Sequence, residues 1–153
     1  MRKINVRFLT ILSATICVLA IGFFLLYRFQ SHRRTRGLLT LVEEKEKAKE
    51  PDEAITFLAR YVATNPKDHA QLKRLALMLK AKTERLMSEG TLDERTFSLA
   101  YQKLEAAVRA NPQDLEIREA TADYMTTFGR LTDAIDYMKE LERIAGDKAK
   151  PEW

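Results

Sequence analysis

The sequence predicts an all-α fold, in which one apolar helix precedes a series of antiparallel helical hairpins. After residue 37 the chain is rich in Leu, Ala, Glu, Lys and Arg, which all favour helices. Only three glycines and four prolines interrupt that stretch. No segment alternates polar residues with apolar β-branched ones, so we predict no strands. Residues 8–27 form one long uncharged segment, FLTILSATICVLAIGFFLLY.

The uncharged segment 8–27 has the length of a transmembrane helix. At about 1.5 Å per residue it would span roughly 30 Å, the thickness of the hydrocarbon core of a bilayer. A cleaved signal peptide is the alternative, but its apolar core is usually shorter and a small-x-small motif would follow. We therefore expect a single-pass membrane protein that contacts the bilayer through residues 8–27.

Basic residues flank the predicted anchor on both sides. Residues 1–7 form a basic tail and residues 28–36 a basic juxtamembrane segment. Because the two flanks carry similar charge, the side of the membrane that holds the rest of the chain stays open. The membrane-flanking residues of the second segment are Arg28, Arg33, Arg34 and Arg36.

The net charge of +4 does not indicate a nucleic-acid-binding protein. Residues 1–36 hold seven Lys and Arg and no acid, whereas residues 37–153 hold 19 basic and 22 acidic residues. The excess positive charge therefore belongs to the flanks of the apolar segment, and we predict no nucleic-acid partner. The single cysteine, Cys17, excludes a disulfide within one chain and a cysteine-based metal site.

Prolines, glycines and aspartates divide the rest of the chain into helices. Asp68, Asp93 and Asp114 have the positions of N-caps, Glu50 is a plausible cap before Pro51, and Gly129 fits a helix C-terminus. The tail over residues 147–153 is polar. The expected helices cover about 37–49, 51–64, 68–88, 94–110, 115–128 and 132–144.

One sequence phrase recurs along these helices. DEAITFLARYVATNPKD (52–68) matches SLAYQKLEAAVRANPQD (98–114). Each copy has an alanine 12 residues before its proline and a leucine four residues after that alanine. TDAIDYMKELERIAGD (132–147) is a third copy in the same register, with glycine where the proline would fall.

This pattern resembles the tetratricopeptide repeat family, whose unit is a helix-turn-helix of 34 residues. The resemblance implies a short right-handed solenoid of about three units over residues 37–146, and a protein-binding role. Its signature packing positions would be Ala54, Leu58, Pro66, Leu72, Leu75, Ala76, Leu79, Ala100, Leu104, Ala107, Pro112, Ala122, Met125, Ala134, Met138 and Leu141.

The chain departs from the family pattern in three places. Pro66 and Pro112 are 46 residues apart rather than 34, so we expect the middle hairpin to be elongated. Tyr61 stands where the family has a small residue, and Arg118 where it has a large apolar one.

No set of residues indicates catalysis. The chain has two histidines, His32 in the basic segment and His69 at a helix start, and neither belongs to a metal-ligand pattern. It has no glycine-rich phosphate loop and no nucleophile motif. We therefore predict neither enzymatic activity nor a cofactor or metal.

The first helix of each repeat would line a concave face, which the family resemblance makes the candidate partner groove. This groove would be basic in the middle unit and acidic in the last one, and would accept a partner of mixed charge. The alternative is that these residues form only solvated helix faces. The candidate groove residues are Lys73, Leu77, Lys80, Glu116, Glu119, Asp123 and Thr126.

The leading hypothesis is a membrane-anchored, bacterial scaffold that mediates protein–protein interactions near the bilayer. One alternative is a structural membrane protein that forms a homo-oligomer through its C-terminal repeat, where no polar capping helix is evident. The other is the N-terminal fragment of a longer multi-repeat protein or of an assembly-machine component.

Overall fold

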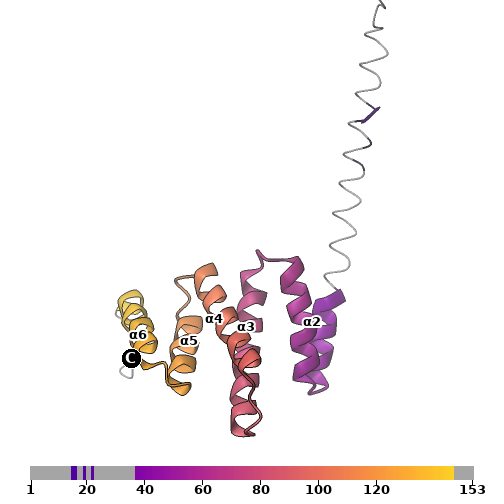
Figure 1. Cartoon of the computed structure of the whole chain (residues 1–153). Coiled ribbons are helices and arrows are strands. Elements are labelled where there is room, and N and C mark those ends of the chain that lie inside the picture. The colour runs from indigo at the N-terminus through magenta and orange to yellow at the C-terminus, as the bar shows by residue number, and fades with distance from the viewer. Residues whose placement is uncertain (1–14, 17–18, 20–21, 23–36, 147–153) are drawn as a thin grey trace, which may run out of the picture.

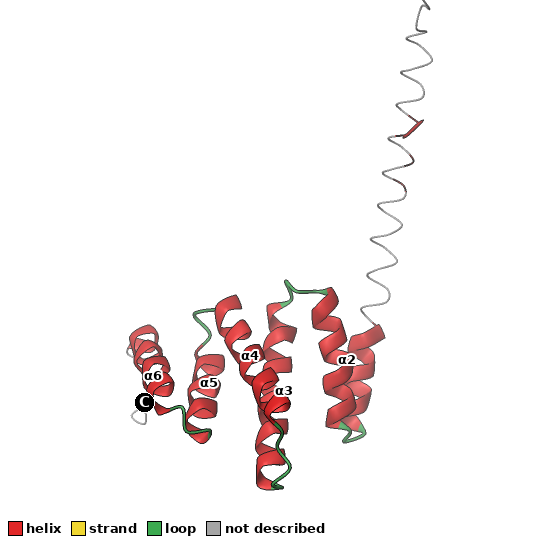
Figure 2. Ribbon diagram, in the orientation of Figure 1, coloured by secondary structure: helices red, strands yellow, loops and turns green. Residues whose placement is uncertain are grey.

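The structure is a computed structural model and describes residues 15, 16, 19, 22 and 37–146 of the 153-residue chain. Within 37–146 it contains six helices and no strand, which confirms the all-α prediction for this part (Figure 2). The helices are residues 37–47, α2 (Pro51–Thr64), α3 (His69–Ser88), α4 (Glu94–Ala110), α5 (Leu115–Thr127) and α6 (Leu131–Ala145).

Successive helices stand side by side in a single row (Figure 1). The helix over 37–47 pairs with α2, α3 pairs with α4, and α5 pairs with α6; α3 also contacts α5. The middle pair is the tallest, with 20 and 17 residues against 13 to 15 in the other three labelled helices. This extra height is what the wide spacing of Pro66 and Pro112 requires.

Two equivalent turns connect the hairpins. In each, the asparagine carbonyl accepts a hydrogen bond at 3.1 Å from the backbone N–H of the aspartate three residues later, in Asn65–Asp68 and in Asn111–Asp114. Each aspartate then caps the next helix, because its Oδ1 accepts from a backbone N–H, that of Gln71 at 3.2 Å or that of Ile117 at 3.3 Å. The recurring NPxD phrase thus encodes one reusable turn-and-cap unit.

The other predicted caps divide into two confirmed and one wrong. Asp93 Oδ1 accepts from the N–H of Thr96 at 2.8 Å. Gly129 ends α5 with φ of +74°, and the next N–H, that of Arg130, reaches back to the carbonyl of Met125 at 2.8 Å. Glu50 makes no side-chain cap, because its carboxylate accepts from Lys45 Nζ at 2.6 Å instead.

The two side chains that depart from the family pattern both fasten an NPxD turn. The Tyr61 hydroxyl donates to Asp68 Oδ2 at 2.8 Å. Arg118 is 8% exposed, and its Nε donates to the carbonyl of Pro112 at 2.7 Å. Their unusual size and polarity therefore support the turns rather than the apolar core.

The core runs along the row between the helices. Of the signature positions named above, all but three are buried; Pro66 and Pro112 lie in exposed turns, and Met138 is half-buried. Small residues such as Ala54, Ala76 and Ala100 are fully buried, which lets neighbouring helices approach closely.

The structure corrects the predicted localisation as a single-pass membrane protein. In the part of the chain that it describes, no helix combines the length and the apolarity that crossing a bilayer requires. Charge is the physical reason, since even the longest helix, α3, has six Lys, Arg and Glu among its 20 residues.

Several predicted segments lie outside the described residues. Of the predicted anchor 8–27, only Thr15, Ile16, Leu19 and Gly22 are described. The basic tail 1–7, the polar tail 147–153, and the segment 28–36 with Arg28, Arg33, Arg34 and Arg36 also fall outside them.

Candidate protein-binding groove

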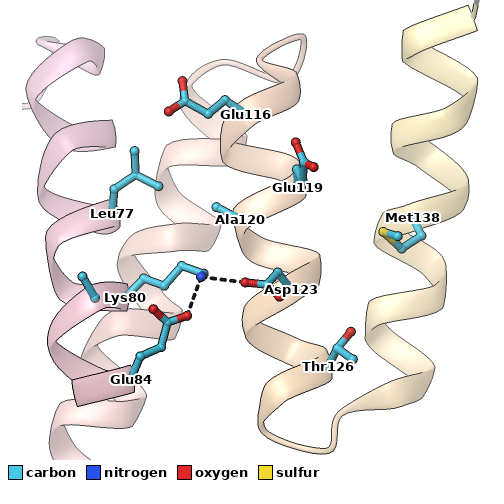
Figure 3. A pocket seen from close by; sticks show the side chains of 10 residues that line it. Leu77, Lys80, Glu84, Glu116, Glu119, Ala120, Asp123, Thr126 and Met138 are labelled. Atoms are coloured by element: carbon cyan, nitrogen blue, oxygen red, sulfur yellow. Dashed lines mark hydrogen bonds and ion pairs between the residues drawn. The ribbon is translucent and has the colours of Figure 1, made fainter. Parts of the chain in front are cut away.

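A groove with a volume of about 670 Å³ lies across α3, α5 and α6 (Figure 3). We call it the concave groove. Six of the seven candidate residues line it, and the seventh, Lys73, forms an ion pair with one of them, Glu116. The lining residues are Leu77, Lys80, Ala81, Glu84, Glu116, Glu119, Ala120, Asp123, Thr126 and Met138.

Helical periodicity aims these side chains into the concave groove. On α3, Leu77, Lys80 and Glu84 follow one another at spacings of three and four residues, which places them on one face. On α5, Glu116, Glu119 and Asp123 repeat that spacing. The opposite face of α3, with Leu75, Leu79 and Thr83, is buried in the core.

Besides the six candidate residues and Ala81, which follows Lys80 directly, three more residues line the groove. Glu84 lies one turn after Lys80, and Ala120 one turn after Glu116, so helical periodicity alone could have found both. Met138 belongs to α6, the second helix of its pair, and the assumption that only first helices line the concave face excluded it.

Lys80 connects the two sides of the concave groove. Its Nζ lies 2.6 Å from Asp123 Oδ2 on α5 and also forms an ion pair with Glu84 on its own helix. Burial lowers the pKa of Lys80, but the hydrogen bonds to these carboxylates outweigh it and hold the pKa above its ordinary value.

Lys73 makes a second connection between the same two helices. Its Nζ lies 2.7 Å from Asp114 Oδ2 and 2.6 Å from Glu116 Oε2. Burial lowers the pKa of Lys73, and the hydrogen bonds to Asp114 and Glu116 raise it by more. The basic and acidic stretches expected from the sequence therefore face each other across the groove and pair.

The concave groove nevertheless has an excess of negative charge. Its lining contains four carboxylates and one ammonium group, a net formal charge of −3. Leu77, Ala81, Ala120 and Met138 supply an apolar surface between these charges. Such a lining suits a peptide segment that presents apolar side chains together with Lys or Arg.

The described residues offer no arrangement for metal chemistry. Within residues 37–146 and the four described residues before them, no three His, Cys, Asp or Glu side chains are grouped so that they could hold a metal ion. Three of the groove carboxylates, those of Glu84, Glu116 and Asp123, are instead paired with lysines.

Comparison with known proteins identifies the fold. No family model and no curated protein sequence matches the chain. Among solved structures, a mutant of MamA superposes with a TM-score of 0.55 at 18% identity, covering 72% of this chain and 72% of that one. MamA MSR-1 C2 gives 0.56 at 17%, covering 75% of this chain and 59% of that one.

A further MamA crystal structure gives a TM-score of 0.56 at 19% identity and covers 78% of this chain. The chain spans 58% of that protein's length. MamA is a helical repeat protein of tetratricopeptide type, so the likeness shows a fold of that type for this chain.

Proposed function

We propose that the chain is a helical-repeat scaffold, without catalysis of its own, that holds a segment of another protein in the concave groove. The observation that carries the proposal is the groove itself, whose lining combines four apolar side chains with four carboxylates. The tetratricopeptide-like fold supports it, because stacked hairpins leave an extended concave surface for binding.

The bound segment combines apolar and basic side chains. Apolar residues would cover Leu77, Ala120 and Met138, and removing this surface from water would supply most of the binding free energy. Lys or Arg side chains would lie against the carboxylates of α5. These contacts would favour basic partners over acidic ones and would weaken as salt concentration rises.

The test fills the groove without touching the core or the ion pairs. Ala81 is exposed and lines the concave groove, so Ala81→Phe adds a ring there without removing a buried side chain; Ala81 also borders a smaller pocket between α2 and α3. Ala63→Phe is the matched control, because Ala63 is also an exposed helical alanine and lies on α2, away from the groove.

Each full-length variant would be used to capture proteins from lysate of the native organism, with quantification by mass spectrometry. We expect at least one protein to be depleted tenfold or more by Ala81→Phe and retained by Ala63→Phe. That protein should elute with salt. If no captured protein distinguishes the two variants, the concave groove is not the binding site and the proposal is wrong.

A further inference from the structure

The last helix of the row exposes an apolar stripe. Leu131 is 58% exposed and Ile135 is 52% exposed. Together with Thr126 of α5 they line a second groove of about 420 Å³, which we call the terminal groove. Its α6 residues are Leu131, Ala134, Ile135, Met138, Lys139 and Glu142.

The internal repeat relates the α6 residues of the terminal groove to residues of α4. Each α6 residue of the terminal groove lies 34 residues after a residue of α4, in the register that aligns Ala100 with Ala134. In α4, Ala100 and Leu104 are fully buried, Val108 is 6% exposed, and two aromatic side chains are partly buried against the core. The α4 set is Phe97, Ala100, Tyr101, Leu104, Glu105 and Val108.

At Phe97, the α4 stripe is covered by the helix that follows it, α5. Tyr124 of α5 stacks on Phe97 with ring centroids 5.5 Å apart, and its hydroxyl donates to the Phe97 carbonyl at 2.9 Å. Phe128, one turn later, lies 4.9 Å from the same ring in an edge-on arrangement. Two aromatic residues four positions apart therefore anchor α5 on α4.

The α5 residue of the terminal groove fits the same scheme. Thr126 lies 46 residues after Lys80, the spacing that separates Pro66 from Pro112. Lys80 pairs with Asp123 of α5, the first helix of the next pair. The terminal groove thus repeats, one unit later, both surfaces on which α5 rests.

We propose that the terminal groove binds an amphipathic helix of a partner protein, which packs on α6 as α5 packs on α4. Its anchors are two aromatic side chains four residues apart, one over Leu131 and one beside Ile135. A tyrosine anchor would donate to the carbonyl of Leu131, as Tyr124 does to that of Phe97.

The charges at the terminal groove refine the partner further. Lys139 stands where α4 has Glu105, and Glu142 stands where α4 has the buried Val108. A partner helix with an acidic residue facing Lys139 and a basic residue facing Glu142 complements both, and an apolar residue at the second position does not.

A second copy of the chain stacked end to end would not supply these anchors. The helix at the other end of the row, over residues 37–47, has the sequence GLLTLVEEKEK and contains no aromatic residue. An end-to-end copy therefore fits the terminal groove less well than a partner helix that carries two aromatic anchors.

The chain itself supplies a probe for this groove. A fluorescent, helix-stabilised peptide of residues 114–129, DLEIREATADYMTTFG, reproduces α5 with its cap and both anchors. Its binding to the full-length chain would be measured by fluorescence anisotropy. We expect saturable binding with Kd below about 100 μM, and loss of binding when both anchors of the peptide are replaced by alanine.

Two protein variants locate the binding. Ile135→Glu should raise the Kd of the peptide at least tenfold. Leu99→Glu, which changes a 41% exposed leucine outside the groove, should change the Kd less than twofold. Circular dichroism would establish that both variants are folded. Equal effects of the two variants, or no saturable binding up to about 1 mM, would overturn the proposal.

Sedimentation velocity tests the alternative that a second copy of the chain, rather than a partner helix, covers the terminal groove. A wild-type chain that is dimeric, and that Ile135→Glu makes monomeric, would show that a second copy covers the terminal groove, which also overturns the proposal. If this proposal fails, the proposal for the concave groove still stands, because Ile135 lines only the terminal groove.

Discussion

Lys73 Nζ lies 2.9 Å from Asp114 Oδ1 and 2.7 Å from Oδ2, so one ammonium group on α3 holds both oxygens of the residue that caps α5. The same Oδ1 accepts from the backbone N–H of Ile117 at 3.3 Å. Asp114 therefore does two things at once: it begins a helix, and it connects that helix to the preceding unit.

Removing Asp114 should cost more than removing an ordinary cap. We expect Asp114→Ala to lower the free energy of unfolding by about 2 kcal/mol, since it loses a cap and a partly buried ion pair. Asp93→Ala, which removes a cap that hydrogen-bonds only within its own helix start, should cost about 1 kcal/mol. Urea unfolding measures both, and equal losses would show that the Lys73 contact adds nothing.

Asp114 should also make stability depend on pH. Burial raises the pKa of its carboxyl, but the hydrogen bond from Lys73 and the cap outweigh it and hold the pKa below its ordinary value of 3.8. A depressed pKa in the folded state means that the contribution is complete above that value and is lost as pH falls below it.

We therefore expect the free energy of unfolding of Asp114→Asn to fall less, between about pH 4 and pH 2, than that of the unsubstituted chain. Asp136→Asn, an exposed change on α6, should follow the unsubstituted chain. Urea unfolding at a series of pH values measures this, and identical slopes for all three proteins would contradict it.

Lys49 should be replaceable with a gain in stability. It ends the helix over 37–47 with φ of +60°, a conformation that strains any residue with a Cβ and that glycine adopts freely. We expect Lys49→Gly to raise the free energy of unfolding by about 1 kcal/mol, measured by thermal and urea unfolding. Glu43→Gly, in the middle of that helix, should lower it by about 1 kcal/mol.

Tyr124 should make the stability of the fold depend on pH in the alkaline range. Burial raises its pKa to about 12, from an ordinary value of 10.0. A pKa raised in the folded state gives stability that is complete below pH 10.0 and is lost as pH rises toward 12.

Tyr124→Phe should thus cost about 1 kcal/mol near neutral pH, because the hydrogen bond to the Phe97 carbonyl is lost. It should also remove part of the alkaline decline in stability. Urea unfolding from neutral to alkaline pH, with absorbance of the phenolates followed in parallel, tests both parts. An alkaline decline unchanged by the substitution would rule out a special role for this tyrosine.

The helices could be predicted from the sequence because their ends depend on neighbouring residues. Asp68, Asp93, Asp114 and Gly129 each act within one helical turn, so local chemistry located them. The cap predicted at Glu50 is absent because Lys45, five residues earlier, donates a hydrogen bond to its carboxylate. The wide spacing of Pro66 and Pro112 was sufficient to predict where the row is tallest.

The groove could be predicted only in part, because its properties depend on contacts between helices. Periodicity on α3 and α5 found the faces that carry Lys80 and Asp123. The placement of the helices side by side brings these two residues together as an ion pair. It also brings Met138 of α6 to the groove. Nothing local in the sequence encodes that placement.

The extra height of the α3–α4 pair has a practical consequence. The loop that joins these helices, around Gly90, is exposed and lies at the projecting end of the tall pair (Figure 1), and none of its residues lines either groove. Exposed loop tips of this kind accept inserted sequence. The projecting tip is therefore the place to attach a fluorophore or an affinity handle, so that binding at both grooves can be observed from a position that disturbs neither.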